Sequence, residues 1–265
     1  MLVLYIGDIM GEVGVEVVET ILPKLRAKDS FDLVIAQAEN VTEGRGIIPS
    51  DFERLKRIGI DFCTGGNWSL HQVSIVPALE DPEAPIIRPA NYPAGTQGLS
   101  YKYANTATGK VLMISLLGQI VGRDANSVLD NPLQVIDDIL AKEKDTTKVA
   151  TIVNFHGDYS SEKRIIGYYL DGKVTAVIGD HWHVPTADAD VLPKGTAHIT
   201  DTGMCGSLDS SLGVKLASVI PRWHDGTKTR NLLEDSGRRQ FNATRIEVDP
   251  KTGLAKSIKL VQQIY

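Results

Sequence analysis

Cysteine is almost absent from this chain of 265 residues. Only Cys63 and Cys205 are present, and they do not form a C-x-x-C pair, so the sequence offers neither a disulfide framework nor a thiolate zinc site. Because such a composition fits a reducing compartment, and because the first residues lack the basic and apolar regions of a signal peptide, we expect a cytoplasmic protein.

Long apolar runs and an excess of positive charge are also missing. No segment approaches the roughly 20 apolar residues that a membrane-spanning helix requires, so we expect no membrane association. The formal net charge of -5 argues against strong binding to nucleic-acid backbones, which relies on clustered Lys and Arg. A small anionic substrate is still compatible with this charge, because bound metal ions can reverse the sign of the local field.

Several familiar catalytic motifs are absent as well. Gly7, Gly11 and Gly14 lack the G-x-G-x-x-G spacing and the Gly-Lys-Ser/Thr ending of nucleotide-binding loops, and no G-x-S-x-G elbow occurs. The triplet 201–203 (DTG) matches aspartic proteases, but that chemistry requires a second copy, which the chain does not contain. The glycines leave a nucleotide-binding sensor as a non-enzymatic alternative, although such a module has no need of clustered histidines.

Short apolar runs that end in polar or turn residues predict buried strands at 2–6, 33–38, 61–64, 111–117, 150–155 and 174–178. Helical patterns lie between them at 14–25, 49–58 and 132–144, and a final hairpin is predicted at 245–248 and 255–261. This alternation predicts an α/β layered architecture. We expect a single domain over 1–265, in which 82–108, rich in Pro, Gly, Asn and Tyr, is a candidate lid or small subdomain.

Polar residues follow directly on five predicted strands: Asp8, Glu39, Asn40, Asn67, His156, His181 and His183. Each has a structural explanation when taken alone, such as a helix cap, a left-handed turn or a core histidine. The carboxyl ends of strands in an α/β sheet face the functional crevice, so these scattered groups are expected to converge. The pair His181 and His183 is the most specific local signal, because alternate residues of an extended segment point the same way.

The chemistry of this set predicts a metal centre. Carboxylate, amide and imidazole ligands together suit borderline divalent ions such as Mn, Fe, Co or Zn better than Mg or Ca. Seven ligands are too many for one such ion and about right for two ions that share a bridging carboxylate.

Ten short motifs resemble, in order, those of the YmdB-like metallophosphoesterases, a family of bacterial cyclic-nucleotide phosphodiesterases in the calcineurin-like superfamily. They are GDIMG (7–11), AEN (38–40), GN (66–67), RPANYP (88–93), FH (155–156), SEK (161–163), GDHWHV (179–184), TAD (186–188), LPKGTA (192–197) and ITDTGM (199–204). The resemblance implies a four-layer α-β-β-α sandwich and a homo-oligomer.

The resemblance also implies the site and its activity. Two divalent transition-metal ions (Fe, Mn or Zn) would be held by two groups of ligands: Asp8, Glu39, Asn40 and His183 for one, and Asn67, His156 and His181 for the other. Glu39 would bridge both ions, which makes it the principal catalytic carboxylate. The implied reaction is hydrolysis of a small nucleotide phosphodiester, a 2′,3′- or 3′,5′-cyclic nucleotide, by metal-bound hydroxide.

The chain departs from the family at the proton donor. Trp68 stands where the family has the His that is the presumed general acid, and an indole cannot give up its proton in a useful pH range. Three explanations stay open: His71 is a substitute acid, the metals and water carry a slower reaction, or the protein binds nucleotides in a regulatory role without turnover.

Two further positions differ from the family. Asp180 and Trp182 stand where small hydroxyl residues are usual. Trp68 and Trp182 are candidate substrate-binding residues that would stack a nucleobase, and packing in a narrowed cleft is the competing interpretation.

Overall fold

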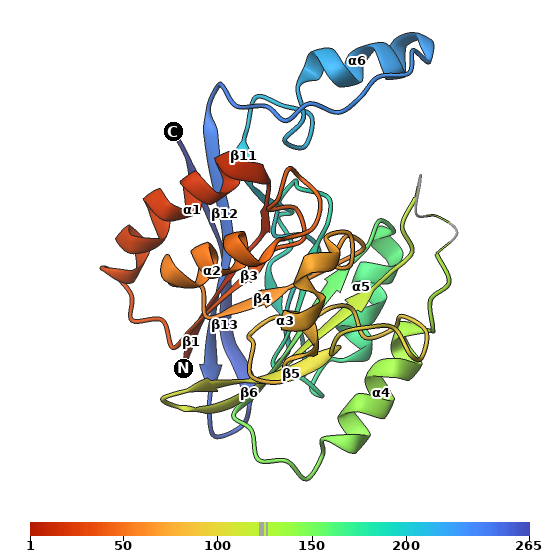
Figure 1. The fold of residues 1–265 in the computed structure, drawn as a ribbon. Helices are drawn as coiled ribbons and strands as arrows, with labels where there is room; N and C mark the ends of the chain where they lie inside the picture. Colours follow the sequence, from red (N-terminus) through yellow and green to blue (C-terminus); the bar gives the residue numbers. More distant parts are fainter. Residues whose placement is uncertain (122–124, 126) are drawn as a thin grey trace.

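The structure is a computed structural model that describes residues 1–121, 125 and 127–265, and it contains two β-sheets (Figure 1). One sheet has seven strands in the order β2-β11-β12-β1-β3-β4, with β13 paired to β12, and the other has six in the order β5-β6-β7-β8-β10-β9. The strands are β1 (Leu2–Ile6), β2 (Asp8–Ile9), β3 (Leu33–Gln37), β4 (Phe62–Thr64), β5 (Tyr101–Thr106), β6 (Gly109–Leu117), β7 (Ala150–His156), β8 (Ala176–Asp180), β9 (Asp190–Val191), β10 (Ala197–Ile199), β11 (Met204–Ser207), β12 (Arg239–Asp249) and β13 (Leu254–Ile264).

The six α-helices described are α1 (Gly11–Arg26), α2 (Pro49–Arg57), α3 (Val76–Glu80), α4 (Pro132–Lys142), α5 (Ser160–Tyr169) and α6 (Leu216–Asp225), with a short 3-10 helix, η1, at Val73–Ile75. Five of them, α1 to α5, cover the outer faces of the two sheets, and α6 lies away from them (Figure 1). The sequence patterns did not predict α5, which follows β7, or α6.

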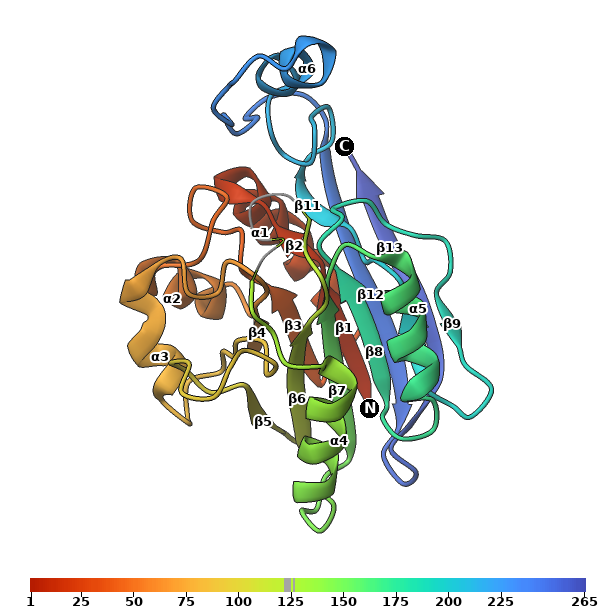
Figure 2. The ribbon, with the colours of Figure 1, turned by 90° about the vertical axis from the view of Figure 1, so that its right-hand side faces the viewer.

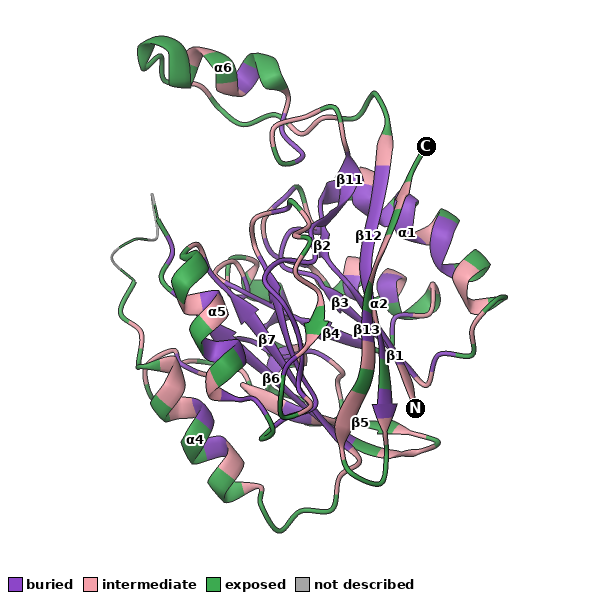
Figure 3. Cartoon of the chain, turned by 180° about the vertical axis from the view of Figure 1, so that it is seen from behind, coloured by how far each residue is buried: buried purple, intermediate pink, exposed green. Residues whose placement is uncertain are grey.

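Three apolar cores separate four layers, and this confirms the expected α-β-β-α sandwich. One core joins α1, α2 and α3 to the seven-stranded sheet, a second lies between the sheets, and a third joins the six-stranded sheet to α4 and α5. Alternation along β1 shows the cause: Leu4 and Ile6 face the helices, while Val3 and Tyr5 face the other sheet. The central strands β3, β7 and β8 are therefore wholly buried, whereas the edge strands β5, β9 and β13 keep exposed residues (Figure 3).

Parallel pairing aligns the carboxyl ends of the central strands. In the first sheet β1, β3 and β4 are parallel, and in the second β6, β7 and β8 are parallel. The register pairs Leu117 with His156 and His156 with Asp180, so three strand ends reach the same edge. The predicted strand at 174–178 is observed two residues later, which places Asp180 inside β8.

The segment 82–108, a candidate lid in the sequence, has two parts. Its last residues form β5, the edge strand that pairs antiparallel with β6. The irregular part before it is anchored by two buried cations. The guanidinium of Arg88 donates to the carbonyls of Gln97 and Thr96 at 2.8 Å each, and Lys102 Nζ donates to the carbonyl of Ala84 at 2.9 Å. A lid function for this segment stays a prediction.

The chain from 208 to 238 extends beyond the ends of β11 and β12 and carries α6 (Figure 2). The charged and polar stretch 222–239 fits this exposed position, although the large apolar side chain of Trp223 on α6 is also 85% exposed. The final hairpin is longer than predicted, since β12 and β13 have 11 residues each. Among the described residues, none of the helices has the length and apolarity to cross a membrane.

Candidate metal centre

His156, at the end of β7, lies at the centre of the predicted ligand set. Its Nε2 atom is 2.9 Å from Glu39 Oε1, 3.0 Å from Asn67 Oδ1 and 2.9 Å from His181 Nδ1. A single ring nitrogen carries at most one proton, so it cannot satisfy three electron-donating neighbours by hydrogen bonding. This crowding of lone pairs around one point is what a divalent cation would stabilise.

The remaining predicted ligands lie beside this group. The backbone N–H of His181 donates to Asp8 Oδ2 at 3.2 Å, and His183 Nε2 is 3.7 Å from Asp8 Oδ1. Within the described residues, Asp8 Oδ1 and Asn40 Oδ1 are buried acceptors without a hydrogen-bond donor. Buried polar atoms rarely lack a partner, and two buried oxygens without donors are suited to coordinate a cation.

Glu39, His156 and His181 offer one ligand atom each, and these three atoms all lie within 4.8 Å of one another. The donor set, the lone-pair crowding and the two orphaned oxygens fit divalent metal ions. The structure thus brings together all seven residues that the sequence singled out, in one buried or half-buried cluster.

Burial controls the protonation of two members of the cluster. Burial, with a contribution from the nearby charge of Asp180, raises the pKa of Asp8 well above its usual value. Burial, with a contribution from His181, lowers the pKa of His183 to about 4. His183 is therefore neutral at pH 7, and because its Nδ1–H faces the carbonyl of Leu212 at 3.1 Å, its Nε2 keeps a lone pair for a metal.

A polar network supports His156 from behind. Asp180 Oδ1 is 2.7 Å from His156 Nδ1, and Asp180 Oδ2 accepts from the hydroxyl of Tyr5 at 2.8 Å. The fully buried Lys163 donates to the Asp180 carbonyl at 2.6 Å and to Asp201 Oδ2 at 2.7 Å. Sequence reasoning noted Asp180 only as a departure from the family and gave Lys163 and Asp201 no role, although both lie within the matching motifs.

The segment that carries His181 and His183 is bent rather than extended. His181 has φ of 100° and His183 has φ of 62°, both in the left-handed region that non-glycine residues rarely occupy. The expectation that an extended segment directs both rings was therefore wrong. Asp201 Oδ2 holds the bend by accepting the Trp182 N–H at 2.9 Å. Strained backbone of this kind is found at functional sites when the surroundings fix it.

A cavity of about 500 Å³ opens over the cluster and is lined by Glu39, Asn40, Trp68, His181, Trp182 and His183, among others. This volume is in the range of small-ligand sites. Asp158, which the sequence did not indicate, also lines it, and its Oδ2 is 3.3 Å from His181 Nε2. The sequence did contain a signal for this role, because Asp158 lies two residues after His156, just beyond the end of β7.

The two tryptophans of the cavity are held differently. Trp182 donates from Nε1 to the Asp158 carbonyl at 2.9 Å, and Lys163 Nζ lies 4.2 Å from its ring centroid, as in a packed residue. Trp68 donates its backbone N–H to Glu39 Oε2 at 2.9 Å, and the guanidinium of Arg45 lies 4.9 Å from its ring centroid.

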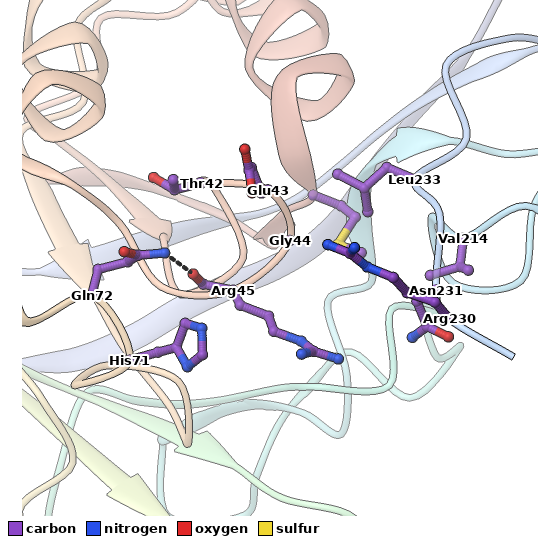
Figure 4. A pocket seen from close by; sticks show the side chains of 11 residues that line it. Thr42, Glu43, Gly44, Arg45, His71, Gln72, Val214, Arg230, Asn231 and Leu233 are labelled. Carbon is purple, nitrogen blue, oxygen red and sulfur yellow. Dashed lines mark hydrogen bonds between the residues drawn. The ribbon is translucent and has the colours of Figure 1, made fainter. Parts of the chain in front are cut away.

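His71, the candidate substitute acid, is exposed and contacts Trp68 edge to face at 5.1 Å between ring centroids. It lines a second cavity of about 230 Å³ (Figure 4), and this cavity adjoins the first because the two share lining residues. The lining of the larger cavity does not include His71.

Comparison with known proteins gives consistent matches along the whole chain. A family model described as YmdB-like protein matches residues 4–261. A 2′,3′-cyclic-nucleotide 2′-phosphodiesterase of Bacillus subtilis is 34% identical over 261 residues, covering 98% of this chain and 96% of its own length.

Two solved structures match the fold closely. A hypothetical protein of Thermus thermophilus has a TM-score of 0.89 and 32% identity, covering 100% of this chain and 99% of its own. A novel phosphatase of Mycoplasma pneumoniae has a TM-score of 0.92 and 28% identity, covering 100% and 93%.

Proposed function

This chain belongs to the YmdB-like protein family and is a phosphoric ester hydrolase, and from that premise we propose that it hydrolyses cyclic nucleotides at a centre of two divalent metal ions. The observation that carries the proposal is the convergence of Glu39, Asn67 and His181 on one nitrogen of His156. The curated relative from Bacillus subtilis supports a 2′,3′-cyclic substrate. A 3′,5′-cyclic nucleotide is the second substrate to test.

The proposed ligands divide as the family resemblance implies. Asp8, Glu39, Asn40 and His183 would hold one ion, and Asn67, His156 and His181 the other, with Glu39 shared. When bound, such ions supply a nucleophile at neutral pH and neutralise the phosphoryl oxygens. Fe, Mn and Zn all suit these ligands, and availability decides between them.

The residues of the chain position the ligands and shape the cavity. Asp180 fixes the His156 ring through Nδ1, and the Trp68 N–H fixes one carboxylate oxygen of Glu39. Asp201 holds the bend that carries both cavity histidines. These contacts set the orientation of the proposed ligands before substrate binds, which is how a site avoids reorganisation during reaction.

The leaving oxygen has no side-chain acid at the position of Trp68. Because His71 lines the adjoining cavity, we infer that the reaction proceeds without a dedicated side-chain acid and is slower for poor leaving groups. The family membership does not favour the alternative of a protein that only binds nucleotides.

The test is hydrolysis of 2′,3′-cyclic AMP, 3′,5′-cyclic AMP and an aryl phosphodiester by Mn-loaded protein, with bound metal quantified in every sample. Glu39→Gln should abolish activity on all substrates and reduce bound metal, while His71→Ala should retain both. No hydrolysis at about two metals per chain would overturn the proposal and support a binding protein. A large loss in His71→Ala at full metal content would identify His71 as the acid.

Two expectations accompany the proposal. The family resemblance implies self-association, so light scattering should give a mass that is a multiple of 28.8 kDa, and a single chain mass would contradict it. The second expectation is a cytoplasmic location. Fractionation of the source cells should recover the protein with the cytoplasmic fraction.

A further inference from the structure

The cavity beside the candidate metal centre is lined by arginines. Gly44, Arg45 and Asn231 line both cavities, so the two spaces adjoin directly. Arg230 lines the smaller cavity and Arg222 the larger one. Figure 4 shows Arg45 and Arg230 reaching into the smaller cavity from two different loops, with Asn231 beside them.

These guanidinium groups differ from other arginines of the chain in their partners. Arg54 and Arg238 form ion pairs with acidic side chains at 2.8 Å and 2.6 Å. In the described part of the chain, no ion pair joins Arg45, Arg222 or Arg230 to a carboxylate. Arg222 donates instead to neutral groups, among them Asn231 Oδ1 at 2.7 Å. Three guanidinium groups without an ion-pair partner among the described residues therefore line this space, together with the carboxylates of Glu43 in the smaller cavity and of Glu39 and Asp158 in the larger one.

The loop that carries Arg45 is tied to the proposed metal ligands. Asn40 Nδ2 donates to the Gly44 carbonyl at 3.0 Å, and Gln72 Nε2 donates to the Arg45 carbonyl at 3.1 Å. The loop fits closely, since a Cβ on Gly46, where φ is 74°, would lie 2.7 Å from the Gln72 side chain. The guanidinium of Arg45 in turn lies over Trp68, whose N–H holds Glu39. The position of Arg45 relative to the candidate metal centre is thus fixed on both sides.

We propose that Arg45, Arg230 and Arg222 form a subsite for a second phosphate group on a nucleotide whose cyclic phosphodiester lies at the metal centre. Guanidinium groups bind phosphate through two parallel hydrogen bonds, and they bind more strongly when no carboxylate competes. The cluster is too small to follow a nucleic-acid backbone, which needs a longer row of cations. One phosphate on the 5′ side of the cyclic nucleotide fits this arrangement.

This inference rests on the proposed function and names its substrate class. The second phosphate has two sources: the 5′-phosphate of a nucleoside 2′,3′-cyclic phosphate, or the internucleotide phosphate that precedes a 2′,3′-cyclic end of an oligoribonucleotide. Both present the same phosphate chemistry to the arginines.

The first experiment compares kcat/KM of the Mn-loaded protein for adenosine 2′,3′-cyclic phosphate, its 5′-phosphorylated form, and a dinucleotide that ends in a 2′,3′-cyclic phosphate. We expect a preference of about tenfold or more for at least one doubly phosphorylated substrate. Whichever of the two is preferred identifies the source. In Arg230→Gln and Arg45→Gln this preference should fall about fivefold or more. Arg238→Gln, a variant of an arginine that lines neither cavity, should keep it.

The second experiment measures binding without turnover. Titration calorimetry compares adenosine 3′,5′-bisphosphate with adenosine 3′-monophosphate on the Mn-loaded protein and on Arg230→Gln. Tighter binding of the bisphosphate, lost in Arg230→Gln, supports the subsite even if no cyclic nucleotide is hydrolysed, in which case only the proposed function fails. Equal binding of both ligands, or equal kcat/KM for all three substrates, overturns the subsite and leaves the proposed function standing.

Discussion

The Nδ1 atom of His156 lies 2.7 Å from Oδ1 of Asp180, and both side chains are fully buried. Burial opposes protonation of His156, but the negative charges of Glu39 and Asp180 outweigh it and raise the pKa of this ring. With a metal ion in place, the same carboxylate would keep the proton on Nδ1 and leave the Nε2 lone pair for the metal. Asp180, which stands where the family usually has a small hydroxyl residue, would therefore orient a proposed metal ligand.

Asp180→Asn should weaken both metal binding and activity by about 10- to 100-fold, because an amide neither holds the His156 tautomer nor balances its charge. The measurement is bound Mn against free Mn, together with hydrolysis of an aryl phosphodiester. Asp188→Asn is the matched control, since Asp188 accepts from Thr186 and Thr200 rather than from a proposed ligand. Unchanged Mn affinity in a folded Asp180→Asn protein would refute a positioning role.

The convergence of the predicted ligands could be read from the sequence because it depends on strand ends. Parallel pairing aligns the ends of β3 and β4 in one sheet and of β6, β7 and β8 in the other. The stacking of the two sheets then places Asn67, which follows β4, beside His156, which ends β7. The way His181 and His183 reach the site could not be read, because their left-handed backbone is imposed by Asp201 from another segment.

Long-range polar contacts also explain what the sequence did not predict. Lys163 is fully buried on α5, and its hydrogen bonds to Asp180 and Asp201, together with the ring of Trp182, make that burial tolerable. No local sequence pattern predicts such a pairing, because Lys163, Asp180 and Asp201 are far apart in the chain. Likewise, Arg222 lines the larger cavity because the 208–238 segment passes over it, an arrangement that the sequence patterns did not predict.

Mn²⁺ should stabilise the protein against unfolding. Asp8 and Glu39 are nearly fully buried, and a bound cation relieves the cost of two buried carboxylates. At a free Mn concentration of 100 times the dissociation constant, the gain in unfolding free energy is about 2.7 kcal/mol for one site. Urea unfolding with Mn and with EDTA measures it. Glu39→Gln should lose most of the gain, Glu162→Gln should keep it, and equal stability of the wild-type protein in Mn and EDTA would exclude a tight site.

The rate should depend steeply on the leaving group. Without a side-chain acid at Trp68, the departing oxygen carries more negative charge, so aryl phosphodiesters with acidic phenols should react faster than alkyl ones. A series of substituted phenyl phosphodiesters gives the slope of log kcat against phenol pKa. His71→Ala should leave this slope unchanged, because His71 lines the adjoining cavity. A shallow slope that becomes steep in His71→Ala would instead show that His71 donates the proton.

His183 should make the metal-free protein less stable in mild acid. Its pKa of about 4 in the folded chain lies below the value of about 6.5 expected when unfolded, so the unfolded chain binds more protons between these values. The free energy of unfolding of the metal-free protein therefore decreases as pH falls through this window, by at most about 3 kcal/mol.

Urea unfolding in EDTA from pH 4.5 to 7.5 tests this dependence. The raised pKa of the buried Asp8 acts in the opposite direction, so the readout is the difference between wild type and His183→Gln. That difference should shrink as pH falls. The exposed His224→Gln serves as the control and should follow wild type. A difference that stays constant across the range would mean that His183 does not titrate as its burial requires.

Gly66 should tolerate no side chain, because it lies against two proposed metal ligands. A Cβ at this position would be 2.4 Å from Glu39 Oε2 and 2.4 Å from Cδ2 of His156, closer than such atoms approach in proteins. Gly66→Ala must therefore displace Glu39 or His156, and we expect a loss of bound Mn and a fall of about 100-fold or more in kcat/KM.

Gly206→Ala is the matched control on β11, where the nearest atom to a new Cβ is 3.4 Å away. Metal content and hydrolysis of an aryl phosphodiester, measured on both folded variants, decide the matter. Full activity in Gly66→Ala would mean that Glu39 and His156 do not bind metal in the positions seen here. The proposed ligand set would then have to be abandoned.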